Sequence, residues 1–86
     1  MKRLDERMIR LIAVGASIAA NCQPCLQTNA AKALESGADE QAIAEAIWVG
    51  KMVRRGAASK MDELAANLSQ KIPATPDLSN VGCGCK

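Results

Sequence analysis

The sequence predicts an all-α protein, a small helical bundle, from two observations. Apolar residues recur at three- and four-residue spacing along most of the chain, starting at Met8, Ile9 and Ile12. Residue types that favour strands are scarce, because the chain has no Phe or Tyr and a single aromatic residue, Trp48. The apolar content is mostly Ala, Ile, Leu, Val and Met, which allows helices to pack closely.

The helical pattern divides into four segments, at about residues 5–21, 22–37, 39–56 and 57–70. Pro24 indicates a helix start, because proline is tolerated in the first turn of a helix and not in its interior. Gly37 is a typical helix end, and Asp39 is a favourable N-cap for the third helix. We expect Gly56 to end that helix.

After Ile72 the composition changes to Pro, Gly, Ser and Asn among few apolar residues. We therefore expect a helical domain over residues 1–72 and a flexible tail over 73–86. The tail ends in Cys83-Gly84-Cys85-Lys86.

Composition limits the function. A chain of 86 residues builds a thin core, so we expect a homo-oligomer. The formal net charge of +2 is too small to indicate nucleic-acid binding. The absence of histidine excludes Ser-His and Cys-His catalytic pairs and every zinc site that needs histidine.

We also expect no membrane segment and no cleaved leader. No run approaches the roughly 20 apolar residues that span a bilayer. Charged residues from Asp5 to Arg10 interrupt the N-terminal segment, which argues against a secretory signal. The expected location is the cytoplasm, where a close cysteine pair is typical of redox or metal-binding proteins rather than of a structural bridge.

Cys22 and Cys25 are the main candidate site. At a helix start, unpaired backbone N–H groups and the helix dipole stabilise a thiolate, the form that attacks peroxides and disulfides. The alternative is that both cysteines are only small buried apolar residues. Gln23 and Pro24 argue against it, because they belong to a turn rather than to a packed face.

Several stretches resemble the carboxymuconolactone decarboxylase and alkylhydroperoxidase D family. They are Leu11–Val14, Ala19–Cys25, Asn29–Ala38 and Ala42–Ala46, within a similarity that covers about residues 7–68. The resemblance implies an all-helical, alkylhydroperoxidase D-like, oligomeric protein. We expect no cofactor. In the redox branch of the family, the cysteine pair reduces peroxides or passes electrons to a partner peroxidase.

Carried over, the resemblance implies that Cys25 attacks the peroxide and that Cys22 resolves the product and meets a dithiol reductant. The family's redox motif has a glutamate twelve residues before the first cysteine and a histidine four residues after the second. This chain has Arg10 and Asn29 at those positions. Arg10 could favour the thiolate by its charge. Asn29, one helical turn from Cys25, is expected to face it or to be only a polar surface residue.

The tail pair, Cys83 and Cys85, leaves three alternatives open. It is a redox arm that exchanges disulfides with Cys22 and Cys25, or it completes a four-sulfur metal site with them, or it is incidental. The metal site is the main alternative function: a thiolate metal-binding protein without turnover. Lactone decarboxylation, the chemistry of the family's other branch, would not explain a cysteine pair.

The densest basic cluster consists of Lys51, Arg54, Arg55 and Lys60. We interpret it as solvated surface near the expected end of the third helix, where positive charge is favourable. We expect Trp48 and the four methionines to lie in the core or at a subunit interface.

Overall fold

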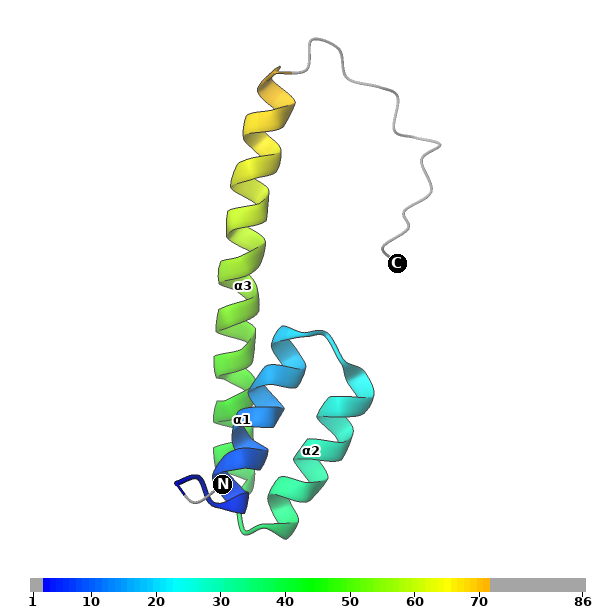
Figure 1. Cartoon of the computed structure of the whole chain (residues 1–86), viewed down its shortest axis with the longest axis vertical. Helices are drawn as coiled ribbons and strands as arrows, with labels where there is room; N and C mark the ends of the chain where they lie inside the picture. The colour runs from blue at the N-terminus through cyan, green and yellow to red at the C-terminus, as the bar shows by residue number, and fades with distance from the viewer. Residues whose placement is uncertain (1–2, 72–86) are drawn as a thin grey trace.

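The structure, a computed structural model, describes residues 3–71. That part of the chain forms three helices, α1 (Glu6–Ala19), α2 (Gln23–Glu35) and α3 (Glu40–Lys71), shown in Figure 1. Residues 3–71 contain no strand, so the predicted all-α class is confirmed. None of these helices combines the length and the apolar character needed to cross a lipid bilayer.

The predicted helix end at Gly56 is wrong. The third and fourth segments form one helix, α3, which runs for 32 residues through Gly56. A glycine inside a helix costs about 1 kcal/mol relative to alanine. Its neighbours Arg55, Ala57 and Ala58 are good helix formers and carry the helix across it. The basic cluster therefore lies along the middle of α3 and not at a helix end.

The other predicted start and stop signals act as expected. Asp39 caps α3, because its Oδ1 accepts a hydrogen bond of 2.8 Å from the Ala42 N–H. Gly37 has a φ of 99° and donates its N–H to the Leu34 carbonyl, 3.1 Å away. The Ala38 N–H reaches back to the Ala33 carbonyl at 3.0 Å. These two bonds form a Schellman motif, the ending that glycine favours.

Helix α1 is the central element. It packs along both α2 and α3, which barely touch each other. The core is small: Val14 and Ala33 are fully buried, and Ala38 and Ile43 are nearly so. Five partly buried side chains surround them: Leu11, Leu26, Ala30, Ala46 and Ile47.

A pair of glycines lets α1 and α3 approach closely. A Cβ atom added to Gly50 would collide with the Gly15 carbonyl oxygen and would lie 2.8 Å from the Ile18 Cβ. A Cβ added to Gly15 would lie 3.1 Å from the Ala46 carbonyl oxygen. The two backbones therefore touch at a point that no side chain could share.

The C-terminal half of α3 extends beyond α1 and α2, as Figure 1 shows. The face of α3 that packs on α1 carries Ile43, Ala46 and Gly50. By helical spacing, the same face continues with Met61, Leu64 and Leu68. These three side chains are more than half exposed in the single chain.

The glycine contact gives a matched pair of substitutions. Gly50→Ala should lower the free energy of unfolding by about 1–3 kcal/mol, because the added methyl group forces α1 and α3 apart. Gly56→Ala should raise it by up to about 1 kcal/mol, because Gly56 has no neighbour within 4 Å of an added Cβ and alanine is the better helix former. Urea unfolding followed by circular dichroism measures both. Equal effects of the two substitutions would contradict the close approach.

Candidate functional site

The turn between α1 and α2 presents the cysteine pair. Asn21 takes the left-handed conformation, with a φ of 57°, which asparagine tolerates better than most residues. Its N–H donates to the Ile18 carbonyl at 3.0 Å, and the Cys22 N–H donates to the Ser17 carbonyl at 2.9 Å. This is a second Schellman motif, and it ends α1 so that the next residue, Cys22, begins α2.

Cys22 is the N-cap of α2, and Pro24 lies in the first turn, as the sequence predicted. The Cys22 and Cys25 sulfurs form a disulfide, and the two Cα atoms are 5.2 Å apart. Cys25 is exposed, whereas Cys22 is half-buried. The bridge thus joins an exposed cysteine, Cys25, to a half-buried one, Cys22.

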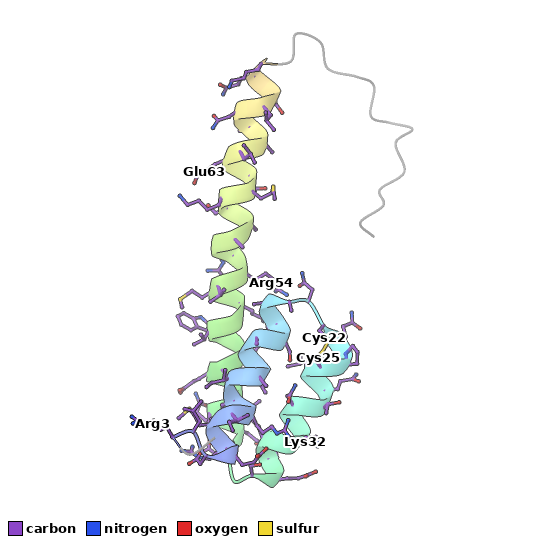
Figure 2. The ribbon with its side chains drawn as sticks, viewed as in Figure 1. Arg3, Cys22, Cys25, Lys32, Arg54 and Glu63 are labelled. Carbon is purple, nitrogen blue, oxygen red and sulfur yellow. A yellow bond between two sulfur atoms is a disulfide. The ribbon has the colours of Figure 1, made fainter. Side chains whose placement is uncertain are left out.

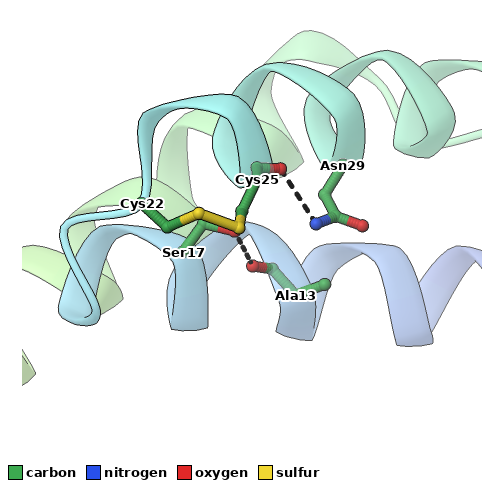
Figure 3. The surroundings of a disulfide bond; sticks show 5 residues. All are labelled: Ala13, Ser17, Cys22, Cys25 and Asn29. Atoms are coloured by element: carbon green, nitrogen blue, oxygen red, sulfur yellow. Dashed lines mark hydrogen bonds between the residues drawn. A yellow bond between two sulfur atoms is a disulfide. The ribbon is translucent and has the colours of Figure 1, made fainter.

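Ser17 is a site residue that the sequence interpretation missed. It is the one polar residue among the buried positions of residues 3–71, with 5% of its surface exposed. Figure 3 shows it against the disulfide, with its hydroxyl donating to the Ala13 carbonyl at 2.6 Å. A polar side chain on the apolar face of α1, five residues before Cys22, is the signal that could have identified it.

Arg10 and Asn29, which are 19 residues apart in sequence, contact each other in the structure. The Arg10 Nη1 donates to the Asn29 Oδ1 at 3.0 Å. The Asn29 Nδ2 donates to the Cys25 carbonyl oxygen at 2.9 Å, as drawn in Figure 3. Asn29 therefore lies between Arg10 and Cys25, and it bonds Cys25 through the backbone carbonyl.

Glu6 completes this group and was not predicted. Its Oε2 lies 2.6 Å from the Arg10 Nε, and the two residues are one helical turn apart. Spacing of this kind is typical of ion pairs on a helix surface, so the sequence held the signal. The carboxylate offsets part of the Arg10 charge.

A pocket of about 340 Å³ lies on the Cys22 side of the disulfide. Its walls include Ser17 and Ile18 from α1, Cys22 and Leu26 around the start of α2, and Lys51 and Arg54 from α3. Figure 2 shows Arg54 at the same end of the helical bundle as the two cysteines. The pocket thus combines one cysteine of the bridge with two cationic side chains.

The tail cysteines, Cys83 and Cys85, lie outside the described residues. Neither their role as a redox arm nor their place in a four-sulfur metal site is tested by the structure. Within residues 3–71, no group of three or more Cys, Asp or Glu side chains is placed to hold a metal ion.

The fold and the site define a small all-helical protein with a Cys-X-X-Cys disulfide at a helix start. The chain belongs to the carboxymuconolactone decarboxylase family, which it matches over residues 2–66. The predicted family is therefore confirmed.

Among curated proteins, the chain is similar to uncharacterized protein 4 in the cox locus of Paracoccus denitrificans. The two are 40% identical over 55 residues, which are 64% of this chain and 50% of that protein. The chain thus spans about half the length of this relative. No solved structure matches the chain.

The Arg10 contacts generate a prediction about the reduced protein. Arg10→Ala should raise the pKa of the Cys25 thiol by up to about 1, because a nearby positive charge favours the thiolate and Glu6 offsets part of it. The measurement is the pH dependence of the alkylation rate of Cys25. Arg7→Ala, on the exposed side of the same helix, should leave the rate profile unchanged. An unchanged profile in Arg10→Ala would remove Arg10 from the site.

Proposed function

We propose that this protein carries out thiol–disulfide redox chemistry through Cys22 and Cys25 and reduces a peroxide or the disulfide of a partner protein. The observation that supports this function best is the pair's position: both cysteines lie at the start of α2, close enough to bridge, with Cys25 at the surface. A purely structural bridge between residues three apart would close a very small loop and constrain the unfolded chain little.

The proposed cycle starts with the Cys25 thiolate. It attacks a peroxide oxygen, the O–O bond breaks, and Cys25 becomes a sulfenic acid while the leaving oxygen takes a proton to give an alcohol or water. The Cys22 thiolate then attacks the Cys25 sulfur, forms the disulfide and releases hydroxide, which is protonated to water. Two electrons from an external dithiol return the pair to thiols.

Local geometry supports a reactive Cys22 in the reduced protein. An N-cap side chain accepts hydrogen bonds from the backbone N–H groups of the second or third helical residue. Here the second residue is Pro24, which has no N–H, so the Cys25 N–H is the suitable donor. That bond and the helix dipole would stabilise the Cys22 thiolate both as attacking and as leaving group.

The test of this function separates the two cysteine pairs by mass. Trypsin releases Cys22 and Cys25 together in peptide 11–32, and the tail cysteines in peptide 72–86. After treatment with one equivalent of hydrogen peroxide, peptide 11–32 should lose two hydrogens, and dithiothreitol should restore them. Cys25→Ser should abolish peroxide consumption, whereas Cys22→Ser should leave a single turnover that stops at the sulfenic acid. A folded protein whose pair stays unreacted would contradict the proposal.

Peroxide turnover should be slow, because general acid–base assistance contributes about 10²–10⁴-fold and the family's glutamate and histidine are replaced. The double variant Arg10→Glu with Asn29→His should raise turnover by at least about tenfold, measured as peroxide loss with dithiothreitol as donor. Asn29→Gln is the control, since it keeps a neutral amide. No gain in the folded double variant would favour reduction of a partner disulfide over peroxide reduction.

We also propose that the protein works as a homo-oligomer, in the cytoplasm, where the pair can be re-reduced. The exposed stripe of Met61, Leu64 and Leu68 supports self-association. An isolated helix of about 16 residues is marginal in water, so the projecting half of α3 needs a partner. A second copy offers the same apolar stripe, and pairing of the two stripes would bury both.

Leu64→Lys tests the oligomer. Because burying a leucine contributes about 1.5–3 kcal/mol, the substitution should weaken association at least about tenfold. Sedimentation equilibrium should give a multiple of the 9.0 kDa chain mass for the parent protein and a shift toward the single chain for the variant. Ser59→Lys, on the opposite side of α3, should associate like the parent. A parent protein that sediments as a single chain would contradict self-association.

A further inference from the structure

The pocket beside Cys22 combines features that the proposed chemistry at Cys25 does not use. Cys22 is among its lining residues and Cys25 is not. A molecule in this pocket would therefore lie against the half-buried cysteine of the bridge and not against the exposed one.

The pocket is positively charged. Lys51 and Arg54 line it, and none of its lining residues is acidic. Within residues 3–71 the ion pairs are Arg10–Glu6 and Lys60–Glu63, so neither Lys51 nor Arg54 is paired with a carboxylate there.

Arg54 is exposed, and two hydrogen bonds orient its guanidinium along the pocket wall. Its Nη1 donates to the Asn21 Oδ1 at 2.9 Å and to the Ile18 carbonyl oxygen at 3.4 Å. Both acceptors belong to the end of α1 and the turn that presents Cys22. These bonds orient the guanidinium toward the turn that presents Cys22 and leave its other N–H groups available to a ligand.

We propose that this pocket binds a small thiol that carries a carboxylate or phosphate group, and that Lys51 and Arg54 hold the anionic group while the sulfur attacks Cys22. The apolar side chains of Ile18 and Leu26 would contact the carbon chain that joins the two groups. This inference rests on the proposed redox function and specifies the reductant that serves it.

The exchange balances as two steps. The thiolate of the first molecule attacks the Cys22 sulfur, forms a mixed disulfide with it and expels Cys25 as a thiolate. A second thiolate attacks the sulfur of the bound molecule, releases the small disulfide and leaves Cys22 as a thiolate. Two small thiols are oxidised to one disulfide, and the protein bridge gains two electrons. Protons from solvent convert the Cys22 and Cys25 thiolates to thiols.

The test compares three thiols of similar size and different charge: 3-mercaptopropionate, 2-mercaptoethanol and cysteamine. The measurement is the rate of reduction of the bridge in peptide 11–32 of the full chain, divided by the thiolate concentration of each reagent. The anionic thiol should react about tenfold faster than the neutral one, and the cationic thiol more slowly than both. High salt should reduce these differences, because exposed charges are screened.

Substitutions assign this preference to the pocket. Lys51→Gln and Arg54→Gln should each reduce the preference for the anionic thiol several-fold and leave the rate with 2-mercaptoethanol nearly unchanged. Arg54→Lys keeps the positive charge and should therefore retain most of the preference for the anionic thiol. Lys60→Gln is the matched control, since it removes the same charge from the projecting part of α3, where Lys60 pairs with Glu63.

The outcomes separate the pocket from the redox function. If the bridge is reduced equally by all three thiols, or if Lys60→Gln alters the preference as much as Lys51→Gln, the pocket is not a thiol site, although the redox function stands. If no thiol reduces the bridge in folded protein, both the thiol site and the proposed redox function are contradicted.

Discussion

The close contact between Gly15 and Gly50 fixes the geometry on which the rest of the structure depends. With no side chain between them, α1 and α3 lie backbone to backbone, and Arg54, one turn beyond Gly50, reaches the Ile18 carbonyl near the end of α1. The same contact brings Lys51 to the turn at Asn21. A larger residue at either glycine would move the cations of α3 away from the cysteine pair.

The turn at Asn21 connects this helix packing to the position of the cysteine pair. Its Schellman motif ends α1 in one step, so that Cys22 caps the next helix beside the buried Ser17. The bridge therefore has two unlike sides. Cys25 is exposed and linked through Asn29 to Arg10, whereas Cys22 faces a pocket with two cations. In our account, oxidant and reductant approach from these different sides.

Arg10 and Asn29 stand where the resembled redox motif has a glutamate and a histidine, and in this chain they bond to each other. An arginine and an amide cannot pass a proton between them near neutral pH, since guanidinium stays protonated and an amide does not titrate. They can hold α1 and α2 together and place a positive charge near Cys25. Glu6 binds the other side of the guanidinium and keeps it in position.

Signals that act locally were predictable from the sequence. Pro24, Gly37 and Asp39 mark helix ends through their own backbone or side-chain chemistry, and the structure places the ends there. The predicted helix end at Gly56 was wrong. A glycine ends a helix only where the chain turns, and the neighbours of Gly56 continue the helix.

The contacts between Arg10 and Asn29, and between Arg54 and the end of α1, join residues 19 to 36 positions apart. They depend on how closely the helices pack, which helical periodicity does not specify. Lys51 and Arg54 are exposed, as the sequence predicts, but helical periodicity does not show that they line a pocket with Cys22. The roles of the individual site residues, Cys83 and Cys85 included, remain predictions.

The most direct test of the central claim is the reduction potential of the Cys22–Cys25 bridge, measured by equilibrating the protein with glutathione or dithiothreitol buffers and quantifying peptide 11–32. A pair that cycles in the cell should titrate reversibly as a two-electron couple at about −270 to −180 mV, the range of redox-active protein pairs. A potential below about −300 mV, typical of permanent structural bridges, would contradict the account.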